Sequence, residues 1–331
     1  MWLDVTTCTK TRSWMLPIRA NYGIGSGEGN VSNDGRFVAI ANDSSMVVVD
    51  MDPHAPNAPP YPYHRIGPVY VFPPCNLDVA APGTCPIGNI SISPSGRYID
   101  VKYRAVTLTG RSGCDTTCDM HRVYEVDTSL AIRPHLMAPA ATRCGSFASR
   151  PDGWIFPLKH ADMMLDPFDD NEDVIIGGRA CPGSNLGHLV KVRLRDGAVT
   201  SLTDPANEAG YAHGSARNIA RPGWFYVTYS RDPAYRGRRF WGEIVAVKID
   251  GSGAVERFGH YHSTASTYRA EAQGVPSPDG RRILFASDWA DHCKAGCGST
   301  SVFQDFVLDA RSPDNSRPPA AVKDRRTRRT Q

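Results

Sequence analysis

A turn followed at once by an alternating strand recurs along this chain, and it restricts the fold more than any other feature. In its clearest form Ser277-Pro278-Asp279-Gly280 precedes the strand Arg282–Ser287. Pro278 fixes φ at the second turn position, and Gly280 can adopt the positive φ that closes a hairpin. Similar segments occur at Val31–Asp43, Ile90–Arg104, Met163–Gly178 and Ala220–Ser230. A strand-rich unit repeated at a spacing of roughly 40–60 residues is typical of a β-propeller.

The repeats predict one all-β domain, residues 1–311, a β-propeller of four-stranded antiparallel blades. Five blades are recognisable, at about 27–74, 89–137, 159–204, 212–261 and 263–310. Residues 1–17 have the pattern of two outer strands, without the inner strands that should precede them. We therefore expect a partial N-terminal blade and an N-terminally truncated reading frame. Residues 312–331 are rich in Pro, Arg, Ser and Thr, and we expect a disordered basic tail.

The positive charge of the chain is concentrated at its C-terminal end. The formal net charge is +3. Residues 311–331 hold seven Lys and Arg and two Asp, a charge of +5, so the other residues carry −2 by subtraction. Because the chain outside residues 311–331 is slightly negative, we do not expect a specific nucleic-acid partner. No stretch approaches the roughly 18–20 apolar residues of a membrane span. We expect a monomer that does not cross a membrane.

The nine cysteines are many for a protein of the reducing cytosol. Six of them form close pairs in loops: Cys75 and Cys85, Cys114 and Cys118, Cys293 and Cys297. We expect short-loop disulfides in a secreted or periplasmic protein, and truncation would explain why residues 1–21 lack a signal peptide. Reduced, inert thiols are the alternative. A zinc site at His292, Cys293 and Cys297 is a weaker one, because a fourth ligand would have to come from elsewhere.

Ionisable side chains precede the turns of three consecutive predicted blades. In chain order they are His160, Asp162, His213, Arg217, His262, Tyr268 and Glu271. The innermost strands of a propeller line its central channel, so corresponding positions in neighbouring blades should converge around one axis. These residues could instead have structural roles. Arg217, Tyr268 and Glu271 could form ion pairs and hydrogen bonds between blades, and His160 could bind Asp162 between strands.

The turn-then-strand repeats resemble TolB-like propellers, in which Ser-Pro-Asp-Gly turns open successive blades. This resemblance covers most of the chain and concerns its architecture. A narrower resemblance is to the propeller polysaccharide lyases of the oligogalacturonate and ulvan type. Those enzymes place His, Arg and Tyr on one face of the propeller, and many carry a bound metal. The segments that carry this resemblance are His160-Ala161-Asp162, His213-Gly214-Ser215 with Arg217, and His260-Tyr261-His262 with Tyr268, Arg269, Glu271 and Gln273.

Two chemistries suit the converging residues. Imidazoles and a carboxylate can hold one divalent metal ion, with the predicted ligands His160, Asp162, His213 and His262. Alternatively, β-elimination of a uronate needs a base for the C5 proton, a cation beside the carboxylate and an acid for the leaving oxygen. The predicted roles are base for His213 or His262, cation for Arg217 and acid for Tyr268.

We therefore predict a carbohydrate-active propeller, a metal-assisted polysaccharide lyase that acts on an acidic glycan by β-elimination. The alternative is a non-catalytic TolB-like propeller that binds a protein or glycan partner. A hydrolase or another metal-dependent enzyme on the same fold is a third interpretation. Several ionisable groups around one point favour the enzyme, because a binding module does not need them.

Overall fold

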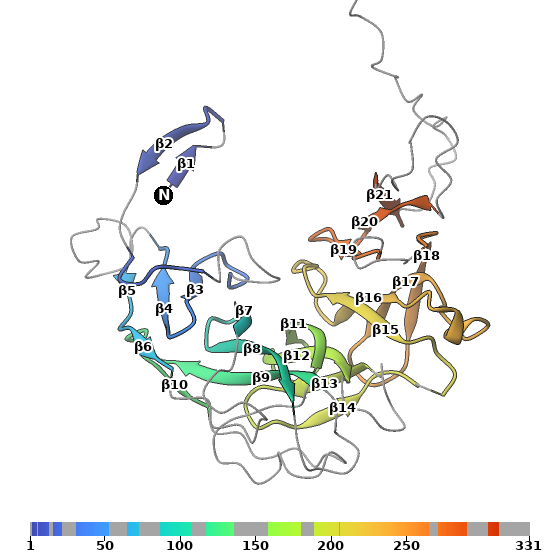
Figure 1. Ribbon diagram of the computed structural model, residues 1–331, viewed down its shortest axis with the longest axis horizontal. Coiled ribbons are helices and arrows are strands. Elements are labelled where there is room, and N and C mark those ends of the chain that lie inside the picture. The colour runs from blue at the N-terminus through green and yellow to red at the C-terminus, as the bar shows by residue number, and fades with distance from the viewer. Residues whose placement is uncertain are drawn as a thin grey trace, which may run out of the picture.

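The structure, a computed structural model, describes residues 2–4, 6–12, 16–21, 31–52, 65–72, 87–107, 117–135, 158–179, 189–204, 206–264, 271–289 and 304–310. Over these ranges the chain forms strands and one short 3-10 helix, η2 (Pro233–Tyr235). The strands make six antiparallel sheets, which follow one another along an arc (Figure 1). The predicted all-β fold of antiparallel propeller blades is confirmed.

The first three sheets come from the N-terminal part of the chain. One sheet pairs β1 (Trp2–Asp4) with β2 (Thr9–Arg12). The next consists of β3 (Phe37–Ala41), β4 (Ser45–Asp50), β5 (Arg65–Ile66) and β6 (Tyr70–Val71), and both β5 and β6 pair with β4. The third has its strands in chain order: β7 (Ile87–Ile92), β8 (Tyr98–Thr107), β9 (Thr117–Val126) and β10 (Ile132–Pro134).

The remaining three sheets repeat this order. One consists of β11 (Leu158–Asp166), β12 (Glu172–Arg179), β13 (Leu189–Arg193) and β14 (Val199–Ser201). The next consists of β15 (Tyr211–Ser215), β16 (Trp224–Tyr229), β17 (Glu243–Lys248) and β18 (Val255–His260). The last has three strands, β19 (Val275–Pro276), β20 (Arg282–Ser287) and β21 (Gln304–Asp309). From here on, blades one to five are the five sheets that begin with β3, β7, β11, β15 and β19.

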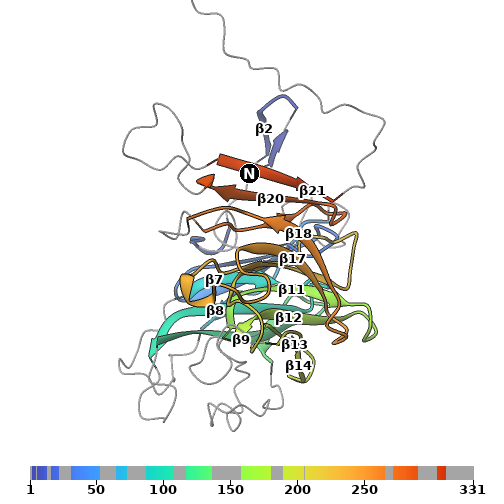
Figure 2. The same cartoon turned by 90° about the vertical axis from the view of Figure 1, so that its right-hand side faces the viewer.

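Within blades two and three the first strand lies toward the inside of the arc and the last toward the outside (Figure 1). Seen from the side, β20 and β21 lie over β17 and β18, which lie over β11 to β14 (Figure 2). Neighbouring first strands are also in contact, β3 with β7 and β11 with β15. Residues at the starts of β11 and β15 can therefore approach each other.

An apolar cluster fills each junction between neighbouring blades. Between blades four and five, for example, Tyr226 and Ile244 pack against Ile283 and Phe285. Equivalent clusters lie between blades one and two, two and three, and three and four. Burial of apolar side chains is the main favourable term in folding, so each blade depends on its neighbours for stability.

The recurring turn has the same hydrogen bonds in three blades. In blade five the Ser277 hydroxyl accepts from the backbone N–H of Arg282 at 3.0 Å, and the N–H of Gly280 donates to the Ser277 carbonyl at 2.8 Å. Gly280 has φ +66°. Ser32 and Ser93 accept from Phe37 and Tyr98 in the same way in blades one and two. The motif is read correctly from the sequence because all of its partners lie within five residues.

The turns also connect neighbouring blades. The N–H of Asn33 donates to the Pro94 carbonyl at 3.0 Å, and the N–H of Ala220 donates to the Pro278 carbonyl at 2.9 Å. The backbone N–H and hydroxyl of Ser95 both donate to the buried Asp173 carboxylate. We call this end of the blades the turn end. The opposite end, where β7, β11, β15 and β19 begin, is the loop end.

Candidate functional site

His160 lies at the loop end, near the start of β11. The pairing of β11 with β12 is irregular between Lys159 and Asp162, so the strand carries a bulge at this position. His160 has φ +47°, which is uncommon for any residue other than glycine. Its carbonyl accepts a hydrogen bond from the Tyr211 hydroxyl at 2.5 Å. Bulges re-aim side chains next to functional sites, and this one fixes the direction of the His160 ring.

His213 occupies the matching position in the next blade. The pairing of β15 with β16 is irregular between Tyr211 and His213, so this strand also carries a bulge near its start. The His213 side chain is buried, with 3% of the residue exposed. The ring centroids of His160 and His213 lie 4.2 Å apart, with an interplanar angle of 54°. Convergence of these two histidines follows from the matched bulges of adjacent inner strands.

Glu271 extends the pair to blade five. Its Oε2 lies 2.6 Å from Nε2 of His213, across 58 residues of chain. A carboxylate accepts hydrogen bonds, so Nε2 carries the proton that is donated to Glu271. A neutral His213 ring then has its lone pair on Nδ1. A carboxylate that orients a histidine in this way is the usual partner of a histidine base.

Burial keeps both imidazoles neutral. The pKa of His160 is lowered to about 2, mainly by burial, and further by repulsion from a protonated His213 ring and from the charges of Lys102 and Lys159. Burial also lowers the pKa of His213, and the hydrogen bond to Glu271 opposes this effect. Neutral rings at neutral pH are a requirement for a histidine that accepts a proton.

Asp162, which is buried, and Arg217, whose side chain is 31% exposed, form an ion pair between blades three and four. Oδ1 of Asp162 accepts from the Arg217 guanidinium at 2.7 Å, and Oδ2 accepts from Nε of Arg217 at 3.2 Å. The backbone N–H groups of Met163 and Ala216 donate to the same carboxylate at 2.9 and 2.8 Å. Arg217 therefore forms the ion pair between blades that was the alternative to a catalytic role. Its charge is balanced by Asp162, which weakens its predicted role beside a substrate carboxylate.

The structure places His262 in a separate cluster of rings. This residue is exposed, and its ring lies 4.7 Å from that of Trp289 and 6.1 Å from that of His260, between centroids. Among the described residues, the His262 ring contacts neither His160 nor His213. The structure thus joins two of the three predicted histidines. A substrate that spans all three stays a prediction.

The predicted divalent metal does not fit the described geometry well. The carboxylate of Asp162 already accepts four hydrogen bonds from Arg217 and two backbone N–H groups. No group of three or more His, Cys, Asp or Glu that could hold a metal occurs in the described part of the chain. We derive no chemical step through a metal. A metal on His160, Asp162, His213 and His262 stays a prediction.

Several predicted residues fall outside the described side chains. These are Tyr268, the proposed acid, and His292 with the three cysteine pairs. Among described cysteines Cys8 is exposed and has a free thiol. The disulfides, and the oxidising compartment inferred from them, stay predictions. Over the described ranges, no helix is long and apolar enough to cross a membrane.

Two lysines near the histidine pair were not singled out from the sequence. Lys102 comes from β8 of blade two, and Lys159 directly precedes His160. Both positive charges act on the His160 ring. Lys159 could have been found from its place beside His160. Lys102 could not, because its place near His160 depends on how blade two packs on blade three.

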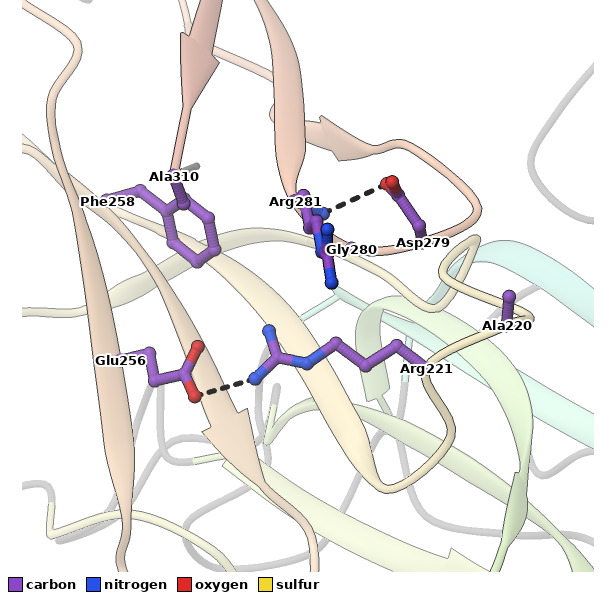
Figure 3. A pocket seen from close by; sticks show the side chains of 8 residues that line it. All are labelled: Ala220, Arg221, Glu256, Phe258, Asp279, Gly280, Arg281 and Ala310. Atoms are coloured by element: carbon purple, nitrogen blue, oxygen red, sulfur yellow. Dashed lines mark hydrogen bonds and ion pairs between the residues drawn. The ribbon is translucent and has the colours of Figure 1, made fainter. Parts of the chain in front are cut away.

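A cavity lies at the turn end, away from the histidine pair. It has a volume of about 460 Å³ and is lined by Ala220, Arg221, Glu256, Phe258, Asp279, Gly280, Arg281 and Ala310 (Figure 3). Arg221 donates to Glu256 at 2.6 Å across its floor and to the Tyr226 hydroxyl at 2.9 Å. These partners engage the Arg221 charge within the wall, so the cavity is a less favourable place for chemistry.

Among known proteins, similarity is found to solved structures alone. No protein-family model matches the chain, and no curated protein matches it in sequence. Similar solved structures include a putative TolB from Agrobacterium tumefaciens, 15% identical, covering 85% of this chain and 76% of that chain with a TM-score of 0.40. The oligogalacturonate lyase of Vibrio parahaemolyticus is 11% identical, with coverages of 87% and 78% and a TM-score of 0.38. A putative 6-phosphogluconolactonase from Bacteroides fragilis is 12% identical, with coverages of 84% and 69% and a TM-score of 0.37.

Proposed function

We propose that the loop end binds an acidic polysaccharide and cleaves it by β-elimination, with His213 as the base. The observation that supports this most is the hydrogen bond from Nε2 of His213 to Glu271, with the His160 ring packed alongside. It orients the ring, sets its tautomer and keeps a lone pair on Nδ1. Burial keeps the ring neutral, so it can accept a proton at neutral pH.

In the proposed step Nδ1 of His213 removes the C5 proton of a uronate. The electrons of that C–H bond form the C4–C5 double bond, and the C4–O bond breaks with its electrons on the leaving oxygen. Tyr268, as predicted from the sequence, gives this oxygen a proton. Lys102 and Lys159 are suited to stabilise the negative charge that grows on the carboxylate, since both act electrostatically on the adjacent His160. The products are an unsaturated uronate and a new chain end.

The test is the ultraviolet absorbance of the unsaturated uronate, followed with polygalacturonate and other polyuronates. His213→Asn should lower the rate by about 100-fold or more, the usual contribution of a positioned base. His260→Asn, at an exposed histidine of the same blade, is the matched control and should keep the rate. Wild-type protein that binds polyuronates without producing this absorbance would contradict the elimination.

One observation favours the non-catalytic alternative. The guanidinium of Arg217 is balanced by Asp162, so the cation that the sequence predicts for catalysis has a structural partner. If wild-type protein binds an acidic glycan without cleaving it, the loop end is a binding face on a TolB-like propeller. Substitution of His213 would then change the affinity for the glycan, and there would be no cleavage rate to change.

A further inference from the structure

The hairpin between β16 and β17 carries the strongest positive charge of the described blades. Residues 230–241 hold four arginines and one aspartate, a formal charge of +3. Each of the four guanidinium groups lies over an aromatic ring of the same hairpin. The distances from guanidinium carbon to ring centroid are 5.3 Å for Arg231 on Trp241, 5.6 Å for Arg236 on Trp241, 5.4 Å for Arg238 on Tyr235 and 4.3 Å for Arg239 on Phe240.

The rings hold the arginines in place before any ligand arrives. The Trp241 indole N–H donates to the Asp232 carbonyl at 2.9 Å, which fixes the ring under Arg231 and Arg236. Phe240 is 1% exposed and belongs to the core between blades three and four. Stacking on a ring face leaves the edge of a guanidinium pointing outward, and this edge carries the N–H groups that bind oxyanions. Arginines fixed in this way lose little side-chain entropy on binding.

Backbone bonds fix the hairpin next to the histidine pair. The N–H of Ser230 donates to the Gly210 carbonyl at 2.7 Å, and the N–H of Ala209 donates to the Arg239 carbonyl at 2.9 Å. A side chain at Gly210 would meet the Tyr235 ring, its Cβ lying 2.8 Å from the nearest ring atom, so the two segments are closely packed. Gly210 stands three residues before His213, about 10 Å along an extended strand. The hairpin and the proposed catalytic base therefore share the loop end.

We infer that residues 230–241 form a subsite for an acidic polysaccharide, in which Arg236 and Arg238 bind its repeated oxyanions beside the His213 site. The inference rests on the proposed function for its ligand class. Both arginines are exposed, whereas Arg231 is partly buried. Carboxylate and sulfate groups offer the same oxyanion chemistry.

The state of the rings favours a polysaccharide over a single-stranded nucleic acid. Proteins that bind single strands present aromatic faces on which bases stack. Here a guanidinium group lies over each of Trp241, Tyr235 and Phe240, and Phe240 is buried, so these rings are less open to stacking bases. Charges at fixed places suit a polymer whose acidic groups recur along its length.

The experiment compares the affinity of the full chain for polygalacturonate, heparin and single-stranded DNA by calorimetry at low and at physiological salt. The double variant Arg236→Ala/Arg238→Ala should bind polysaccharide about tenfold or more weakly, since each charge-assisted contact is a strong one. The control is Arg281→Ala/Arg282→Ala, which removes two exposed arginines at the turn end and should keep wild-type affinity. Polygalacturonate and heparin distinguish carboxylate from sulfate as the preferred group.

The outcomes separate this inference from the proposed function. If the hairpin variant binds weakly and the control variant binds normally, the inference is supported, whether or not the wild type cleaves and whatever the affinity of His213→Asn. If the hairpin variant binds like the wild type, or loses as much affinity as the control variant, the inference fails even where cleavage is observed. Tighter binding of DNA than of either polysaccharide also overturns it. Equal melting temperatures of the two double variants show that folding is not the cause.

Discussion

The two ends of the blades are built from different kinds of interaction. At the turn end, serine hydroxyls, glycines and backbone groups make short hydrogen bonds that repeat from blade to blade. At the loop end, strands β11 and β15 are interrupted by bulges, and ionisable side chains from three blades meet. The turn end joins the blades by a repeated turn. The bulge at the loop end is shared by β7, β11 and β15, but in β11 and β15 it carries histidines. We locate function where these bulges bring His160, His213 and Glu271 together.

The largest effect should come from the ion pair between Asp162 and Arg217. Asp162→Ala leaves the Arg217 charge and two backbone N–H groups without their carboxylate. Because Arg217 is 31% exposed, the loss of unfolding free energy should lie below that of a fully buried pair, about 3–5 kcal/mol. Asp196→Ala, which removes a partly exposed partner of Arg193, should cost less than about 1 kcal/mol. Urea denaturation of both variants measures this. Equal small losses would show that the Asp162–Arg217 pair is not a structural link.

A second prediction concerns the turn end. Gly35 and Gly280 both have positive φ, +73° and +66°. A Cβ at Gly35 meets nothing within 4 Å, whereas one at Gly280 would lie 2.3 Å from the Tyr226 hydroxyl oxygen. Alanine at Gly35 should therefore cost about 1–2 kcal/mol for the left-handed backbone alone.

Alanine at Gly280 should cost about 1–3 kcal/mol more, because the turn must also move away from Tyr226. Thermal unfolding of the two variants side by side checks the difference. If they lose the same stability, Gly280 is not closely packed against Tyr226 of β16, and the contrast between the two ends weakens.

The third prediction uses pH. The folded protein holds His160 and His213 with lowered pKa values, while the unfolded chain protonates them near pH 6.5. The unfolded state therefore binds more protons below about pH 6.5, and stability falls as pH decreases through this value. Each histidine contributes at most about 1.4 kcal/mol per pH unit. His160→Gln should flatten the stability curve between about pH 7 and pH 5, and an unchanged slope would contradict the buried neutral pair.

The smallest effect should follow removal of metal ions. Because the carboxylate of Asp162 already accepts from Arg217 and two backbone N–H groups, we expect a chelator to leave the melting temperature unchanged. Calorimetry with and without EDTA, followed by added Zn²⁺, Ca²⁺ or Mn²⁺, is the measurement. A rise in melting temperature with one ion, lost in His213→Asn, would restore the predicted metal site.

The sequence is informative where interactions are local. Ser277 and Gly280 bind within their own turn, so the motif predicts each hairpin and its repetition predicts the propeller. The nearness of His160 to His213 also follows, since both hold the same place in adjacent repeats. The partners of Arg217 and the position of Lys102 do not, because they depend on strand bulges and on the packing of one blade against the next. His262 shows where this reasoning by matching positions fails, because its ring lies against Trp289 and not against the other two histidines.

Titration of an oligogalacturonate into protein with isotope-labelled histidine, tryptophan and glycine shows which end of the blades binds it. If function resides at the loop end, the His160 and His213 ring signals and the Trp241 indole N–H shift, and the amides of Gly35, Gly96 and Gly280 do not. Shifts confined to the turn-end glycines, or to the cavity beside Gly280, would contradict it.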